Sequence, residues 1–301
     1  MSETSLVSVY ITTRNRPDML DRALASLTKQ TFRNFEVLIC NDNSEAKYLS
    51  YYTNVIEKYN NSFNGLVYIV NENTMGACYS RNILIHQAKG EFVTGLDDDD
   101  YFFPERLELF ISFGELNKYS FICANVTIAS TERIKTREGG MVISLDEMKN
   151  FNAVGNQIFV KKHIIESVGG FDTDMPAWQD YDTWLRIINK HGAAYKLNAC
   201  TMYLDTDTSR NRISTTSKAY NGYETFIRKH AGILSEHNLL SLKYMDLINR
   251  KVEFSIFCKE LIGEFSLQKD YLNIGCHTIT QDFIIFIINI LNKRIREKYA
   301  Y

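Results

Sequence analysis

The chain has 301 residues, of which 45% are hydrophobic and 13% aromatic, and its formal net charge is −2. This length and composition suit one large domain, alone or with a smaller appendage, and they exclude wholesale disorder. The nearly balanced charge argues against a nucleic-acid partner, because such binders neutralise phosphates with an excess of Lys and Arg.

The six cysteines lie far apart and form no CxxC pair, so a zinc site or a redox dithiol has little support. Most are expected to be small core residues in a reducing compartment. The N-terminal segment lacks the basic start and apolar run of a signal peptide. No run reaches the roughly 18 apolar residues of a membrane-spanning helix. A cytoplasmic location is therefore expected.

Strand-like and helix-like segments alternate through residue 116. Short β-branched runs predict strands, and leucines at helical spacing after Pro17 predict the first helix. The alternation predicts an α/β fold with a parallel sheet covered by helices on both faces. Arg14, Asp42 and Asp97 each follow a predicted strand, so they should be neighbours at the sheet edge where such folds bind ligands. The predicted strands are residues 6–12, 35–40, 66–70 and 91–96, and the later helices are 45–59 and 77–88.

The pattern loosens after a fifth predicted strand at residues 121–126. Residues 127–155 are expected to form a polar connection, followed by a strand at 156–160. A helix ending at Gly192 then carries Trp184, Ile187 and Ile188 on one apolar face. From about residue 220 the chain is expected to be helical, without further strands.

Four aspartates, Asp97–Asp100, stand between an apolar strand and the aromatic segment YFFP. A run of like charges is usually a solvated loop without a task. Alternatively, a divalent cation removes the repulsion, since Mg²⁺ and Mn²⁺ bind one or two carboxylates together with substrate phosphates. In an extended segment Asp97 and Asp99 would share one face.

Three blocks of the sequence resemble family 2 glycosyltransferases with the GT-A fold, of the type that builds bacterial surface polysaccharides. The blocks are VSVYITTRNRPDMLDRALASLTKQTFRNFEVLICNDNS, NENTMGACYSRNILIHQAKGEFVTGLDDDDYFFPERL and GGFDTDMPAWQDYDTWLRI. The resemblance implies a Rossmann-like, mostly parallel sheet flanked by helices, in a catalytic domain of residues 1–215. Residues 1–120 would form its nucleotide-binding half and 121–215 its acceptor-binding half, with a helical extension at 216–301.

By the same resemblance, the segment after the first strand lines the base and ribose, and Asp42 accepts a hydrogen bond from a uracil imide. The implied nucleotide-sugar residues are Thr12, Arg14, Arg16, Asp42, Arg81, Asp97 and Asp98. Surface salt bridging remains an alternative for Arg14 and Arg16. Asn41 and Asn43 depart from the family's acid and glycine, and Asn43 is expected to adopt the left-handed turn conformation.

The resemblance also implies a metal and a base. Asp99 would bind Mn²⁺ or Mg²⁺ on the donor diphosphate, while Asp97 would lie near the ribose and Asp100 would support the metal or the acceptor. Asp180 would be the base that deprotonates the acceptor hydroxyl, although Gln179 replaces the usual glutamate before it. Asp182, two residues further on, is an alternative base.

Three further features of the sequence each allow two interpretations. Trp178 either stacks on a sugar ring or belongs to the core. The loop with Arg210 and Arg212 either closes on the diphosphate or is solvated. Residues 283–291 are apolar and precede four basic residues, so this segment either lies on an anionic membrane surface or packs on the catalytic domain.

The expected function is inverting, metal-dependent transfer of a hexose, glucose or galactose, from a UDP-sugar. The expected acceptor is a polyprenyl-diphosphate-linked O-antigen or capsule intermediate, which gives a β linkage at the inner face of the cytoplasmic membrane. One alternative is a sugar nucleotidyltransferase, although TTRNRPD lacks the glycine-rich segment typical of that class. Another is a non-catalytic carbohydrate-binding protein on the same fold.

Overall fold

The computed structural model describes residues 6–128, 134–135, 140–205, 217–252 and 260. The contacts of the chain divide it into two compact units, Met1–Arg250 and Lys251–Tyr301. The helices α8 (Ser217–Lys229) and α9 (Glu236–Asn249) lie in the first unit, and the domain bounds given from the sequence stay a prediction.

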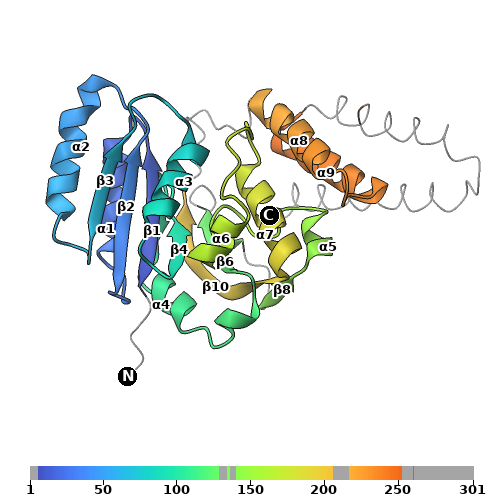
Figure 1. Cartoon of the computed structure of the whole chain (residues 1–301), viewed down its shortest axis with the longest axis horizontal. Helices are drawn as coiled ribbons and strands as arrows, with labels where there is room; N and C mark the ends of the chain where they lie inside the picture. The colour runs from blue at the N-terminus through green and yellow to red at the C-terminus, as the bar shows by residue number, and fades with distance from the viewer. Residues whose placement is uncertain (1–5, 129–133, 136–139, 206–216, 253–259, 261–301) are drawn as a thin grey trace, which may run out of the picture. The chain divides into compact units, whose positions relative to one another are not determined.

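The first half of the sheet is parallel, in the strand order β3-β2-β1-β4 (Figure 1). Each predicted strand and helix of this half is present, within a few residues of its expected ends. Pro17 is the first residue of α1, where its missing N–H removes no hydrogen bond. The elements are β1 (Val7–Thr13), α1 (Pro17–Leu27), β2 (Phe35–Asn41), α2 (Ala46–Tyr59), β3 (Leu66–Val70), α3 (Ala77–Gln87) and β4 (Phe92–Gly95).

The second half of the sheet is mixed, in the order β4-β9-β6-β10-β5. Strand β9 is antiparallel to both β4 and β6, while β10 runs parallel to β6. Short strands and helices also interrupt the connection expected at residues 127–155. The elements are β5 (Tyr101–Phe102), α4 (Arg106–Ile111), a 3₁₀ helix (Leu116–Lys118), β6 (Ile122–Ile128), β7 (Ile134–Lys135), β8 (Met141–Ile143), α5 (Leu145–Met148), β9 (Phe159–Lys161), α6 (Lys162–Ser167), α7 (Gln179–His191) and β10 (Ala194–Leu204).

Two hydrophobic cores cover the two faces of the sheet. On one face the β1 residues Val7, Val9 and Ile11 pack with buried residues of α1 and α2. On the other face Tyr10 packs with residues of α3, α7 and α8, among them Trp184. Burial from both sides explains why β1 and β2 are almost continuous apolar runs rather than alternating ones.

The strand order makes a site at the sheet edge. The connections leave β1 and β4 toward opposite sides of these neighbouring strands, and ligands bind at such a switch point beyond the carboxyl ends. Residues 14–16 follow β1, and the four aspartates follow β4.

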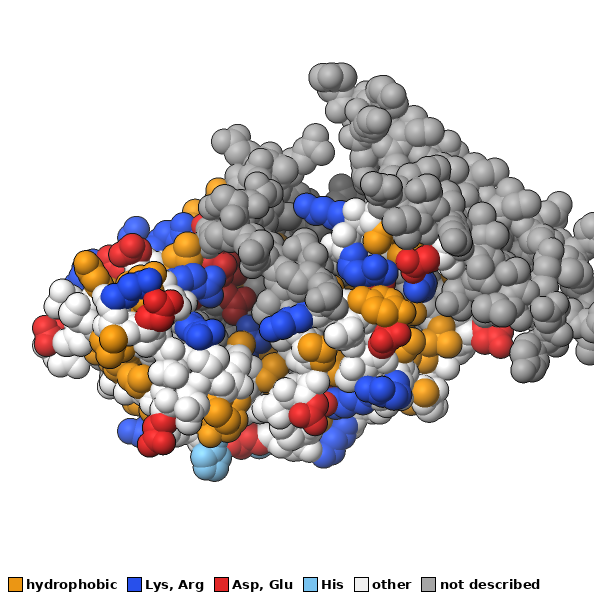
Figure 2. All heavy atoms as spheres, turned by 90° about the horizontal axis from the view of Figure 1, so that it is seen from above, with side chains coloured by type: hydrophobic (Ala, Val, Ile, Leu, Met, Phe, Trp, Pro, Cys, Tyr) orange, Lys and Arg blue, Asp and Glu red, His pale blue; other side chains and the backbone are white. Residues whose placement is uncertain are grey.

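On the face shown in Figure 2, basic and acidic side chains of the described residues are interspersed, with apolar side chains in small patches. Within the described part of the chain, no helix is both long enough and apolar enough to cross a bilayer.

Candidate active site

The four aspartates form a turn rather than an extended strand, because the Asp100 N–H donates to the Asp97 carbonyl at 3.0 Å. Their exposure nevertheless alternates. Asp98 and Asp100 are buried, whereas the side chains of Asp97 and Asp99 are 27% and 25% exposed. Asp97 and Asp99 are thus the more exposed pair, but the segment is a turn and not the extended strand on which their shared face was predicted. We call residues 97–100 the acid loop.

Arg16 lies beside the acid loop. Its Nη2 is 2.6 Å from Asp98 Oδ1, and its Nη1 is 3.4 Å from Asp99 Oδ2. The Arg16 N–H donates to the Tyr52 hydroxyl at 2.9 Å, which fixes the backbone where it leaves β1. Arg16 thus forms salt bridges inside the candidate site, while Thr12 is half-buried and Arg14 is exposed.

Arg81 joins residues that are far apart in the sequence. Its Nη2 lies 2.9 Å from Asp97 Oδ1, and its Nη1 lies 3.0 Å from Asp180 Oδ1. The guanidinium carbon is 5.0 Å from the centre of the Phe171 ring, a cation–π distance. One buried arginine therefore holds the acid loop and the start of α7 together.

Asp180 has the environment of a general base. It lies in the first turn of α7, and its side chain is 25% exposed. Burial raises the pKa of Asp180 to about 6, with Arg81 opposing the rise and Asp97 adding to it. A carboxylate that titrates close to neutral pH is a better proton acceptor than an ordinary aspartate.

The buried members of the acid loop also titrate abnormally. Burial raises the pKa of Asp98 to about 7, although Arg16 opposes this rise. Burial and the neighbouring charges of Asp97 and Asp99 raise the pKa of Asp100 to about 8. For both carboxyls burial is the main cause of the raised pKa, and the neighbouring aspartates add to it.

Three residues of the site were missed by the sequence analysis. Asn156 Nδ2 donates to Asp97 at 3.2 Å and to Asp100 at 3.3 Å. The Asp205 N–H donates to Asp100 Oδ1 at 3.0 Å, and Arg22 forms an ion pair with Asp205 at 2.8 Å. Asn156 begins the strand predicted at 156–160, and Asp205 directly follows β10. Their positions at strand ends could have identified both residues from the sequence.

The charges of the site fit a divalent cation. Asp180, Asp205 and the four acid-loop aspartates give six carboxylates, against the three guanidinium groups of Arg16, Arg22 and Arg81. Among the described residues, no group of three or more His, Cys, Asp or Glu side chains is arranged to hold a metal alone. Mg²⁺ and Mn²⁺ on a diphosphate need only one or two carboxylates, and the partly exposed Asp99 can supply one.

Asp42 is buried where α3 begins. Its carboxylate accepts hydrogen bonds from the N–H groups of Met75 and Gly76 at 2.8 and 2.9 Å, and from Asn71 Nδ2 at 2.8 Å. Asp42 thus anchors the turn before α3, and a uracil imide would be a further donor to it. Asn43 has a φ of 54°, which confirms the left-handed conformation expected there.

The two remaining candidates near α7 face the interior. Asp182 is fully buried, and hydrogen bonds from His230 and Arg186 overcome burial and lower its pKa to about 2. Trp178 is half-buried and packs on Tyr181, with ring centroids 5.6 Å apart, and on α8. Arg210 and Arg212 lie outside the described residues.

The mixed sheet flanked by helices is the GT-A fold of glycosyltransferases, and comparison with known proteins agrees. Residues 8–169 match the sequence profile of Glycosyl transferase family 2. The match covers more than half of the chain, so the chain belongs to this family and is a glycosyltransferase.

Two relatives illustrate the family. Escherichia coli WcaA, whose name describes a colanic acid biosynthesis glycosyl transferase, is 30% identical over 76% of this chain and 83% of its own length. Escherichia coli WfaP, named a UDP-Glc:alpha-D-GlcNAc-diphosphoundecaprenol beta-1,3-glucosyltransferase, is 28% identical over 79% of this chain and 92% of its own.

Two solved structures confirm the predicted GT-A fold. Staphylococcus aureus TarS in complex with UDP has a TM-score of 0.61 at 19% identity, covering 86% of this chain and 79% of that one. A mannosyltransferase of Pyrobaculum calidifontis with GDP-Man and Mn²⁺ has a TM-score of 0.60 at 13% identity, covering 99% and 88%. At these identities the likeness shows the fold alone.

Proposed function

We propose that this glycosyltransferase moves a hexose from a UDP-sugar to a sugar acceptor, with inversion at the anomeric carbon and with help from Mn²⁺ or Mg²⁺. The observation that carries the proposal is the shared contact of Asp97 and Asp180 with Arg81. This contact sets a carboxylate of raised pKa beside an acid loop, at the sheet edge where nucleotides bind.

In the proposed reaction Asp180 accepts the proton of the acceptor hydroxyl while that oxygen attacks the anomeric carbon. Arg81 orients the Asp180 carboxylate and favours its ionised form. Asp99 would hold a divalent cation, which when bound would supply Lewis-acid stabilisation for the leaving diphosphate. Asn156 and Arg16 hold the acid loop in the shape that presents Asp97 and Asp99.

The proposed donor is a uridine nucleotide, with glucose or galactose as the sugar. Asp42 supports uridine, because its carboxylate lies at the start of α3 close to the acid-loop edge of the sheet. The WfaP name also specifies UDP-Glc. The mannosyltransferase complex contains GDP-Man on a similar fold, so the choice of nucleotide rests on side chains such as Asp42 rather than on the fold.

The proposed acceptor is a sugar on a polyprenyl diphosphate in O-antigen or capsule assembly. The name of WfaP specifies such a diphosphoundecaprenol acceptor and a β linkage. An acceptor of this kind is held in a membrane, which supports peripheral attachment of this enzyme at the inner face of the cytoplasmic membrane. The segment proposed for that attachment, residues 283–291, lies outside the described residues.

A donor screen with Mn²⁺ and the purified full-length chain tests the proposal. UDP-glucose or UDP-galactose should release UDP in the presence of a GlcNAc-diphospho-lipid acceptor, and GDP-mannose should not. The anomeric coupling of the product in NMR should show a β linkage from the α-linked donor. An α linkage would contradict inversion, and turnover with GDP-sugars alone would contradict the role of Asp42. Sugar-1-phosphate and UTP should give no UDP-sugar, which separates this reaction from a nucleotidyltransferase.

A further inference from the structure

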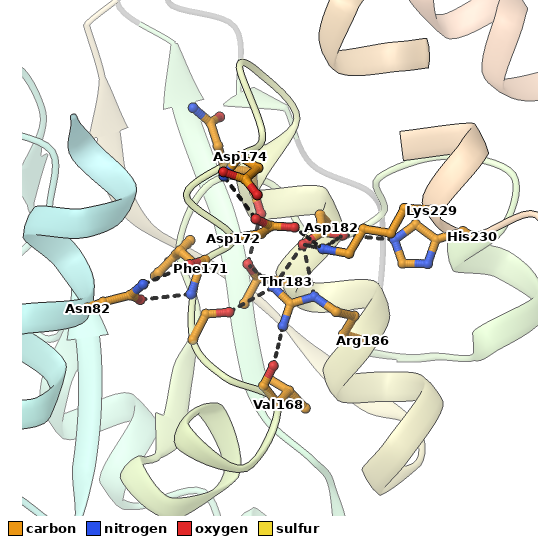
Figure 3. Close-up of polar contacts among 12 residues, drawn as sticks. Asn82, Val168, Phe171, Asp172, Asp174, Asp182, Thr183, Arg186, Lys229 and His230 are labelled. Atoms are coloured by element: carbon orange, nitrogen blue, oxygen red, sulfur yellow. Dashed lines mark hydrogen bonds and ion pairs between the residues drawn. The ribbon is translucent and has the colours of Figure 1, made fainter. Parts of the chain in front are cut away.

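Asp182 is the buried centre of a cluster of charged side chains that joins α7 to α8 (Figure 3). Its Oδ1 lies 2.8 Å from His230 Nε2 and 2.9 Å from Lys229 Nζ, and its Oδ2 accepts from Arg186 Nε at 2.9 Å. Lys229 also pairs with Asp172 at 2.5 Å. Lys229 is the last residue of α8 and His230 follows it, so the cluster fixes the end of α8 against α7.

Arg186 extends from this cluster to a tight turn. Its Nη1 donates to the Val168 carbonyl at 2.6 Å, and its Nη2 donates to the Gly170 carbonyl at 2.7 Å. Gly169 and Gly170 have φ angles of 82° and 68°, which only glycine adopts at little cost. The Gly169 N–H donates to the Glu166 carbonyl at 2.9 Å and the Gly170 N–H donates to the Ile165 carbonyl at 3.0 Å, and the planar guanidinium adds two further bonds that fix the carbonyls of the turn.

The turn positions Phe171 against α3. The Phe171 N–H donates to Asn82 Oδ1 at 2.8 Å, and its carbonyl accepts from Asn82 Nδ2 at 2.7 Å (Figure 3). Asn82 is the neighbour of Arg81 on α3, and the Phe171 ring supports the Arg81 guanidinium. The contacts are therefore continuous from Asp182 to the arginine that binds Asp97 and Asp180.

We infer that Asp182 is a positioning residue which, through Arg186 and the turn before Phe171, holds Arg81 in contact with both Asp97 and Asp180. The inference rests on the proposed role of Asp180 as the base. An ionised carboxylate suits this task because it accepts from Arg186, Lys229 and His230 at once, whereas an amide offers a single acceptor oxygen. Asp182 itself does not touch the reacting groups.

A second aspartate provides a matched control. Asp246 in α9 is also fully buried, and its carboxylate binds Arg250 four residues later, through Nε at 2.9 and 3.0 Å. Asp182 and Arg186 have the same spacing on α7. Loss of either carboxylate should cost stability, and of the two arginines it is Arg186 that binds the turn before Phe171.

The contact between Arg81 and Asp180 has a measurable signature. The groups that face Asp180 are Arg81 and Cys78 from α3, Asp97 from the acid loop, and Tyr10 from β1. Arg81 is the cation among them, and it lowers the pKa of Asp180. Displacement of Arg81 should therefore raise that pKa, whereas a general loss of stability should leave it unchanged.

The test compares the full-length chain with Asp182→Asn, Asp246→Asn and Arg186→Lys. The Asp180 carboxyl is titrated by ¹³C NMR after aspartate labelling and is assigned by its absence in Asp180→Asn. Asp182→Asn and Arg186→Lys should raise the pKa of Asp180 by about 1, the effect of losing a close opposite charge. The kcat of these two variants should fall roughly tenfold or more, because a displaced Arg81 no longer orients Asp180. The donor KM should change little. Asp246→Asn should melt at a lower temperature, but the pKa of Asp180 and the kcat should stay at their wild-type values.

An unchanged Asp180 pKa in folded Asp182→Asn would overturn the inference. Should Asp182→Asn fail to fold, Arg186→Lys decides, because it keeps a cation beside Asp182 but cannot bind both carbonyls of the turn. An unchanged pKa in that variant would equally overturn the inference. The NMR readout needs no turnover, so a chain inactive with every donor would contradict the proposed function and still leave the positioning role measurable.

Discussion

At the scale of single residues, Asp180 and Asp182 show how strongly position decides chemistry. Both lie in the first turn of α7, yet the pKa of Asp180 is raised to about 6 and that of Asp182 is lowered to about 2. Asp182 contributes stability that is fully present above the ordinary aspartate pKa of about 3.9 and is lost as the pH falls through 2. Asp180 is partly exposed and pairs with one cation, Arg81, which suits its proposed role as the base.

Replacement of the proposed base should remove turnover without removing donor binding. Asp180→Asn should lower kcat by roughly 10²-fold or more, because the amide accepts no proton. In the wild-type enzyme kcat should rise with pH through about 6, since Asp180 works in its ionised form. The measurement is UDP release against pH at saturating donor. A fully active Asp180→Asn would move the base to another residue.

Turnover should require a divalent cation that binds through the Asp99 carboxylate. Chelation with EDTA should abolish transfer and Mn²⁺ or Mg²⁺ should restore it, because the acid loop carries more carboxylates than neighbouring cations. Asp99→Ala should lose nearly all turnover, measured as UDP release. Asp146→Ala is the control, since that aspartate is 91% exposed on α5 and pairs only with Lys149. Full turnover in chelator would remove the metal from the mechanism.

Most aspartates and arginines of the candidate site were predicted from the sequence, but residues that contact the acid loop were missed. Asp42, Arg81 and Asp97 were identified because they stand in blocks that resemble a known family. Asn156 and Asp205 were missed, since their contacts with the acid loop span 56 to 105 residues and no local pattern encodes them. The burial of Asp182 likewise depends on α8, which begins 35 residues after it (217 − 182).

At the scale of elements, β1 and β2, which were predicted, differ in burial from β10, which was missed. β1 and β2 are buried along nearly their whole length and consist of continuous apolar residues. β10 has eleven residues but is mostly half-buried, and its pairing with β6 is irregular. Residues 195–199 (YKLNA) alternate between apolar and polar, but the alternation breaks at Cys200, where the pairing with β6 changes register.

Helix α8 should set the position of the segment that precedes Asp180. A Cβ added at Gly222 would lie 2.7 Å from Ala177 Cβ and 2.9 Å from the Ala177 carbonyl, closer than side chains pack. Gly222→Ala should therefore displace residues 177–180, destabilise the protein by about 1–3 kcal/mol and lower kcat. Thermal melting and UDP release measure the two effects.

Gly232→Ala is the matched control, because a Cβ there meets no atom within 4 Å. This variant should melt and turn over like the wild type. If Gly222→Ala melts earlier but keeps its kcat, then α8 stabilises the fold without positioning the start of α7.

At the scale of the whole molecule, a parallel half and a mixed half share one sheet. The parallel half supplies the loops after β1 and β4, and the mixed half supplies Asn156, Asp180 and Asp205. The regular alternation of the first half made the fold class predictable from sequence. The second half combines parallel and antiparallel pairs and includes several short strands, so its pairing is set by tertiary contacts rather than by local periodicity.

Membrane attachment should depend on the C-terminal segment. The apolar stretch FIIFIINIL at residues 283–291 is followed by Lys293, Arg294, Arg296 and Lys298. Each basic residue near an anionic surface contributes up to about 1 kcal/mol, so four together should hold the protein reversibly on anionic liposomes. The full-length chain should sediment with such liposomes at low salt and be released at high salt, because salt screens the charges.

Replacement of these four residues by Glu should abolish the sedimentation and leave UDP release to a short water-soluble acceptor unchanged, because these residues are not among the proposed site residues. Neutral liposomes serve as the control surface, and the wild-type chain should bind them weakly. If the charge-reversed variant instead melts earlier and loses activity, the segment packs on the protein and does not bind lipid. Binding that resists both high salt and charge reversal would show that the apolar stretch alone holds the enzyme at the membrane.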